Sequence, residues 1–342
     1  MIELKNDRLS FSFPDVHPHA KLAITFQRTL RIPDNGKTYP LPPGLGAFPL
    51  RHVDDFGATV PGDWLEHGGV MMPMYQSEAL WLLFSSEFDR ERGVQYPCAI
   101  KVATGKIDAV TGKEWANGLN RRPQDYMVTP GQPWLDGYCV EKGVIRQFVA
   151  MPLGDGYSAE EQITGKAEHG GMQLIVYPMK RDVFERRFPI RPREKLRSQL
   201  AAKRKCRSSS PAASMGLAPG GRMKQKIYVD PFDFSDWDLT QSSRCFVHIA
   251  NSLTWRDITK QAPPYPPPSA ADYTRRKLPW FAYYDDSPAV EGSGILGKLK
   301  SVLGIAKEKR ETPLPENEAC EPQNVVTIVA KRTGDEVREG TF

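Results

Sequence analysis

The first clear pattern in the chain is an alternation of apolar and less apolar residues. Large apolar side chains occupy every second position from Leu22 to Phe26. A period of two is typical of a strand with one buried face, so a strand is predicted over residues 22–32. The tetrapeptide at 33–36, Pro-Asp-Asn-Gly, combines a proline that fixes one turn residue with an Asn-Gly pair that tolerates positive φ. We therefore expect the chain to reverse there and form a hairpin with residues 37–41.

Apolar residues are densest between residues 68 and 179, where the main core is expected. Cys98, Ile100 and Val102 alternate with other residues, and Thr-Gly at 104–105 supplies a turn. Further strands are predicted at 107–110, 138–140, 144–151 and 172–177. The run 72–84 is compatible with strand or short helix, because an unbroken apolar run does not distinguish the two.

Two helices are predicted from local signals. Ser158 followed by Glu161 forms a capping-box pair, and Gly165 supplies a stop, so a short helix is expected between them. In residues 294–310, apolar residues recur at helical spacing with lysines on the other side. The apolar stripe of that second helix could pack on the protein's own core or lie on a membrane, and packing on the core is the commoner arrangement.

Composition favours strands and loops. The 342 residues include 30 prolines and 28 glycines, and 40% of the chain is hydrophobic. This combination predicts a mainly β fold, a β-rich α+β protein with an antiparallel sandwich or barrel-like core over residues 1–180 and a few short helices. A smaller, aromatic-rich part is expected at 227–306 and packs on the main domain, and a mostly solvated tail follows at 307–342. An alternative is one large α+β domain into which residues 181–226 are inserted.

Positive charge is concentrated in that inserted segment. Residues 181–226 hold 14 of the 46 lysines and arginines and only 3 of the 41 acidic residues. Ser, Ala, Pro and Gly dominate its second half, so a basic, mobile linker or insert is expected. Its densest cluster, Lys203, Arg204, Lys205 and Arg207, could bind nucleic acid or an anionic membrane. Few aromatic residues accompany the cluster, so a solvated linker is the preferred interpretation.

Several classes of protein are disfavoured by what the sequence lacks. The longest apolar run is far shorter than a membrane-spanning helix, so no transmembrane segment is predicted. The five cysteines are widely spaced without a CxxC pair, which favours free thiols in a reducing, cytoplasmic setting. The Thr-Gly-Lys repeats at 104 and 111 depart from a phosphate-binding loop. Cys245 and His248 have no second ligand pair. No cofactor and no metal are predicted.

Candidate chemical residues are few. Cys139 and His169 occur in an order compatible with a thiol nucleophile and its base, which would place a hydrolase-like site within residues 136–171. A cysteine between apolar neighbours in a strand is more often a buried hydrophobic residue, and burial of this thiol would remove the hypothesis. Trp134, Gln132 and Trp115 are candidates for lining a ligand groove.

The sequence favours a non-enzymatic cytosolic binding or protein-interaction protein, because no complete catalytic or cofactor signature accompanies the abundant aromatic and loop residues. The hydrolase-like site is the alternative. Attachment to nucleic acid or an anionic membrane through residues 181–226 is a second alternative, and it predicts binding that weakens steeply with salt.

Overall fold

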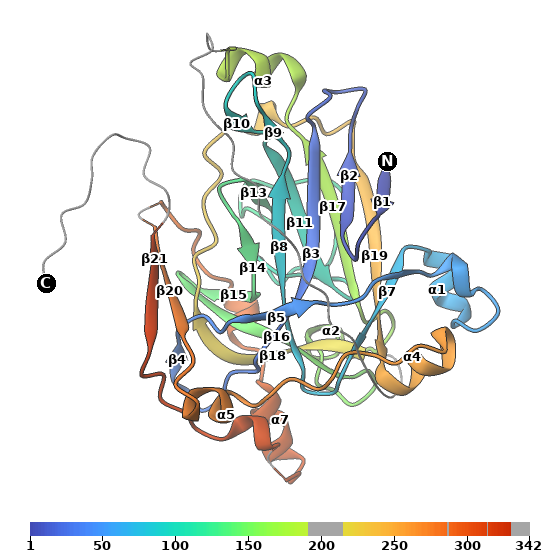
Figure 1. The fold of residues 1–342 in the computed structure, drawn as a ribbon, viewed down its shortest axis with the longest axis vertical. Helices are drawn as coiled ribbons and strands as arrows, with labels where there is room; N and C mark the ends of the chain where they lie inside the picture. The colour runs from blue at the N-terminus through green and yellow to red at the C-terminus, as the bar shows by residue number, and fades with distance from the viewer. Residues whose placement is uncertain (191–214, 286, 313, 330–342) are drawn as a thin grey trace, which may run out of the picture.

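The computed structural model describes residues 1–190, 215–285, 287–312 and 314–329. Its framework consists of two large open sheets, so the prediction of a β-rich α+β fold is confirmed (Figure 1). The first sheet has the order β1-β2-β3-β8-β16-β18-β4, and three short strands, β5, β14 and β15, pair at its sides. Its strands are β1 (Ile2–Leu4), β2 (Leu9–Ser12), β3 (Lys21–Thr29), β4 (Thr38–Tyr39), β5 (Gly44–Ala47), β8 (Ala79–Ser86), β14 (Trp134–Leu135), β15 (Gly137–Glu141), β16 (Val144–Pro152) and β18 (Met215–Lys224).

The second sheet has the order β12-β11-β17-β19-β7-β6, with β13 paired to β11. Its strands are β6 (Arg51–His52), β7 (Val70–Met74), β11 (Cys98–Thr104), β12 (Ile107–Asp108), β13 (Met127–Thr129), β17 (Met172–Pro178) and β19 (Ser243–Asn251). One hydrophobic cluster contains buried residues of both sheets, among them Phe26 and Phe148 of the first and Ile100 and Val176 of the second. The two sheets therefore enclose a common core, as in a sandwich.

Short helices and two small sheets surround this core. The two small sheets pair β9 (Phe88–Asp89) with β10 (Val94–Gln95) and β20 (Trp280–Tyr284) with β21 (Val325–Val329). The helices are α1 (Gly62–His67), α2 (Ala159–Thr164), α3 (Arg181–Arg187), α4 (Ser252–Thr259), α5 (Ala270–Arg275), α6 (Gly294–Gly297) and α7 (Val302–Glu308). In the part of the chain that the structure describes, no helix is long and apolar enough to cross a membrane.

The chain reverses after residues 33–36, but the prediction that residues 37–41 pair with β3 is wrong: β5 returns to β3 antiparallel, with Gln27 opposite Ala47 and Thr29 opposite Gly44. β3 pairs antiparallel with β8 from Leu22 opposite Ser86 to Thr29 opposite Ala79, and β4 pairs in parallel with β18 instead. The segment that follows β3 is fixed by a side chain of another strand. Gln147 of β16 accepts a hydrogen bond from Ile32 N (3.0 Å) and donates one to Leu30 O (2.8 Å). These long-range bonds satisfy backbone groups that a hairpin would otherwise have paired.

The structure also differs from the expected linker at 181–226. The described residues at its two ends are ordered as α3 and as β18, which lies between β16 and β4 in the first sheet. Small residues allow β18 to fit there. A Cβ atom on Gly221 would lie 2.6 Å from Pro33 O, so only glycine permits this approach to the chain after β3. The cluster at Lys203, Arg204, Lys205 and Arg207 lies outside the described residues.

The aromatic carboxy-terminal segment packs on the main body. Trp280 is completely buried in a cluster with Ile32, Tyr39 and Met223, which belong to or adjoin the first sheet. Residues 294–310 form two short helices in place of one long one. Ser301 begins α7 by accepting a hydrogen bond from Gly304 N (3.2 Å), and an N-cap at this position ends the continuous helix.

Candidate functional site

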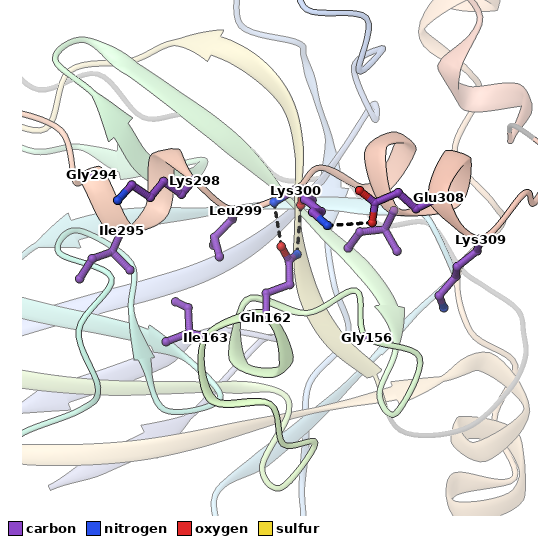
Figure 2. Close-up of a pocket in the computed structure, with 11 residues that line it drawn as sticks. Gly156, Gln162, Ile163, Gly294, Ile295, Lys298, Leu299, Lys300, Glu308 and Lys309 are labelled. Atoms are coloured by element: carbon purple, nitrogen blue, oxygen red, sulfur yellow. Dashed lines mark hydrogen bonds and ion pairs between the residues drawn. The ribbon is translucent and has the colours of Figure 1, made fainter.

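A groove with a cavity volume of about 630 Å³ lies between the α2 region and the α6–α7 segment (Figure 2). One wall comes from α2 and the loop between β16 and α2, and the other from the two carboxy-terminal helices and the turn between them. Its lining residues are Gly156, Gln162, Ile163, Gly294, Ile295, Lys298, Leu299, Lys300, Ile305, Glu308 and Lys309.

Local sequence signals build the α2 wall. Ser158 begins the helix, and its hydroxyl accepts a hydrogen bond from Glu161 N (3.1 Å), while Ser158 N donates to Glu161 Oε2 (3.0 Å). The other carboxylate oxygen of Glu161 accepts from Gly154 N (2.9 Å) and Gly156 N (2.7 Å). One glutamate thus holds both the helix start and the loop that precedes it. The capping box predicted from the sequence is present.

Apolar packing fixes the opposite wall. Leu296, Leu299, Val302 and Ile305 are buried, so most of the apolar stripe of residues 294–310 faces the protein's own core, whereas Ile295 is exposed. Ser293 begins α6 and also donates a hydrogen bond from its hydroxyl to Thr111 O (2.5 Å). With most of the apolar side chains turned inward, the lysines of this segment remain at the groove and at the surface.

Gln162 crosses the groove and divides it. Its side chain donates to Lys300 O (3.0 Å) and accepts from Lys300 N (2.7 Å), so it replaces backbone partners that the turn between α6 and α7 lacks. Figure 2 shows Ile163 and Ile295 on one side of Gln162, and Gly156 and Lys309 on the other. The groove therefore has an apolar end and a polar end.

The cations of the groove differ in their partners. Lys300 pairs with Glu308 (Nζ to Oε2, 2.8 Å), and Lys309 donates to Asp155 O and lies 4.4 Å from the centre of the Tyr157 ring. The ammonium group of Lys298 has no hydrogen-bond or ion-pair partner within 1–190, 215–285, 287–312 and 314–329. Lys298 lies at the apolar end, where Ile295 is 43% exposed. That end thus offers an unpaired positive charge beside exposed aliphatic surface.

The predicted dyad of Cys139 and His169 does not form. Cys139 is 2% exposed on β15, and burial raises the pKa of its thiol to about 12. The second cause of that shift is Asp108, whereas the charged groups that act on His169 are Lys106, Glu168 and His67. A neutral thiol enclosed in apolar packing is not an available nucleophile.

His169 lies in a cluster of histidines. Its ring centre is 6.3 Å from that of His67, and its Nε2 atom is 3.8 Å from Glu168 Oε2. Burial lowers the pKa of His169 and also that of His248, whose Nε2 donates a hydrogen bond to Gly68 O (2.9 Å). The adjoining cavity is about 20 Å³, enough for a single water molecule. Among the described residues, no group of three or more His, Cys, Asp or Glu side chains is arranged to hold a metal ion.

The other predicted ligand residues have structural contacts. Gln132 is buried, donates to Trp134 O (2.9 Å) and accepts from Tyr228 N (3.0 Å). Trp134 packs edge-on against Tyr283, with ring centres 4.7 Å apart. Trp115 is covered by the cations of Lys101 (5.1 Å) and Arg244 (5.5 Å). None of the three lines the groove between α2 and α6–α7.

Sequence reasoning identified both walls of this groove without joining them. The capping pair predicted α2 and the helical spacing predicted the 294–310 segment, but the bond between Gln162 and Lys300 links positions 138 residues apart. No protein-family model matches this chain, and neither a curated protein nor a solved structure matches it. The fold and the groove define the chain as a β-rich protein with a groove that is apolar at one end and rich in lysine.

Proposed function

We propose that this chain is a binding protein whose groove accepts a segment of a partner protein that carries an acidic residue beside a large aliphatic one. The observation that supports this function is Lys298, which has no ion-pair partner in the described part of the chain and lines the apolar end of the groove with Ile163 and Ile295. An open surface groove of this kind suits an extended side-chain pair of a partner better than a small molecule, which is usually enclosed on most sides.

The aliphatic contact and the ion pair would contribute different amounts of binding free energy, and so they would have different roles. Covering one leucine-sized side chain on Ile163 and Ile295 contributes roughly 1.5–3 kcal/mol. An ion pair at the exposed Lys298 contributes about 1 kcal/mol or less. The aliphatic contact would therefore supply most of the affinity, and the charge would select acidic partners and exclude basic ones.

The alternative functions have less support. The hydrolase-like site over residues 136–171 depends on Cys139 as nucleophile, and the buried state of that thiol argues against it. Attachment to nucleic acid or an anionic membrane through the cluster at 203–207 is a separate hypothesis that no described residue supports. Its signature would be affinity that falls steeply with salt and is lost when residues 191–214 are deleted.

The experiment is fluorescence anisotropy with a fluorescein-labelled peptide of alternating glutamate and leucine, and with the matching lysine–leucine peptide. We expect only the acidic peptide to bind, and Lys298→Glu to weaken it about tenfold, since repulsion replaces attraction at the apolar end. Lys307→Glu is the matched control because Lys307 is exposed on α7 and does not line the groove.

Ile295→Ala should weaken binding by a similar factor, and the protein should still prefer the glutamate–leucine peptide to the lysine–leucine peptide. Equal losses in Lys298→Glu and Lys307→Glu would show that the peptide responds to overall charge, and the groove would then not be the binding site. Circular dichroism of each variant checks that the fold is retained.

A further inference from the structure

Strand β21 presents an apolar edge. It pairs in parallel with β20 on one side, from Trp280 opposite Val325 onward, and no described residue pairs with its other side. Val325, Val326 and Ile328 are 42%, 45% and 44% exposed. In Figure 1, β21 is the outer strand of this small sheet. Both faces and one edge of the strand are therefore accessible.

This exposure is unusual for such a strand. Parallel strands are ordinarily covered on both faces, and a two-stranded sheet is seldom stable without a further element. Proteins normally protect free edges by making them short or charged. Other edge strands of this molecule follow that rule: β1, β4 and β6 have two or three residues and contain or adjoin Glu3, Lys37 and Arg51. β21 has five residues, and none is charged.

We infer that β21 pairs with β21 of a second copy of this chain, antiparallel and centred on Thr327. The sequence Val-Val-Thr-Ile-Val is nearly symmetric about its threonine, so a two-fold axis through Thr327 places Val326 opposite Ile328 of the second copy. Aliphatic residues then face aliphatic residues, and the two threonines are opposite each other. No pair in this register brings like charges together, so the strand is complementary to itself.

A second copy accounts for the observations better than a charged peptide does. The free edge carries main-chain donors and acceptors, which an added strand would satisfy as in strand addition to a sheet. The exposed side chains offer no charge with which to select an acidic or a basic partner. The resulting four-stranded sheet would run β20-β21-β21-β20 across the dimer. This interface is separate from the groove, so its failure would leave the proposed function untouched.

The first test measures mass by sedimentation velocity at micromolar concentration. The wild-type chain is expected at twice its monomer mass of 38.4 kDa. Val326→Lys with Ile328→Lys places lysine opposite lysine and should give a monomer. Val326→Lys with Ile328→Glu carries equally many charged residues but places lysine opposite glutamate, so the dimer should return. Leu253→Lys, at an exposed apolar position on α4, is the control and should remain dimeric.

The outcomes are decisive. A wild-type monomer, or a dimer that persists in the double-lysine variant, overturns the inference. If both double variants are monomeric, the antiparallel register centred on Thr327 is wrong. Unchanged circular dichroism shows that the variants are folded.

A second test uses Thr327→Cys in a Cys206→Ser background, because the other four cysteines are buried. A short bis-maleimide should link two chains through residue 327. Leu253→Cys in the same background should not be linked. The absence of a linked dimer through residue 327 would contradict the proposed pairing.

Discussion

At the scale of single residues, buried polar side chains replace missing backbone partners. The chain contains 30 prolines, which interrupt strands and helices and so produce many loops. The backbone N–H and C=O groups of those loops have no strand or helix partner. Buried glutamines satisfy several of them: Gln147 holds the end of β3, and Gln132 joins the loops at Trp134 and Tyr228. Lys101, 2% exposed, likewise pairs with Asp125 (2.7 Å) and donates to Ala116 O (2.8 Å). Sequence patterns did not identify these roles, because each of these side chains has at least one partner that is distant along the chain.

Asp136 gives a pH-dependent prediction at this scale. Burial raises the pKa of its carboxyl group to about 7, even though Gln225 donates to it (2.7 Å). The folded pKa exceeds the unfolded value of 3.8, so the proton stabilises the folded state fully below about pH 4, and this contribution is lost as the pH rises towards 7. We expect Asp136→Asn to gain stability relative to wild type over that range, by at most about 1.4 kcal/mol per pH unit.

Urea unfolding at pH 4, 5, 6 and 7 measures this difference. Asp108 is also buried with its pKa raised to about 7, but it titrates equally in both proteins and therefore cancels. Asp155→Asn, an exposed position, is the control. A stability difference that stays constant from pH 4 to pH 7 would show that Asp136 does not titrate in this range.

At the scale of elements, local signals succeeded where an element depends on its own residues. The hairpin of β11 and β12 and that of β15 and β16 form where turn residues separate two apolar strands. The helix α2 begins and ends at the predicted residues, Ser158 and Gly165. The chain does return to β3, through β5, but the partner of residues 37–41 was missed. Those residues form β4, which pairs with β18 about 180 residues later, and no local pattern specifies that choice.

Glu161 gives a prediction for α2 and the loop before it. Its carboxylate accepts hydrogen bonds from Gly154 N, Gly156 N and Ser158 N, so Glu161→Ala leaves three backbone donors without that partner. We expect a loss of about 2 kcal/mol in the free energy of unfolding. Urea denaturation measures it, with Glu66→Ala, exposed on α1, as the control. Equal effects of the two substitutions would remove the special role of Glu161.

At the scale of the whole molecule, the carboxy-terminal part is joined to the main body through a shared core. Trp280 donates to Thr274 Oγ1 (3.2 Å) within its own part, yet it packs with Ile32 and Met223 of the main body. Phe281 also exchanges backbone hydrogen bonds with Leu41 (2.7 and 2.9 Å). This arrangement is expected to unfold as one cooperative unit.

Trp280→Ala should therefore destabilise the entire chain, by about 3–5 kcal/mol, because a fully buried indole is removed from a core that both parts share. Circular dichroism and tryptophan fluorescence should report one coincident urea transition, shifted to lower urea in the variant. Tyr265→Ala, whose side chain is 72% exposed, is the control and should change little. A second transition that responds alone to Trp280→Ala would mean that the carboxy-terminal part unfolds independently.

The sequence by itself determined the β-rich class, the two local hairpins and the start and end of α2, because apolar period, turn residues and caps act within a few residues. Only the tertiary structure decided that residues 215–224 form β18, that Cys139 is enclosed, and that α2 and α6–α7 face each other across a groove. Each of these depends on contacts between distant segments. Burial and pairing at such distances depend on how the whole chain packs, which periodicity and composition do not specify.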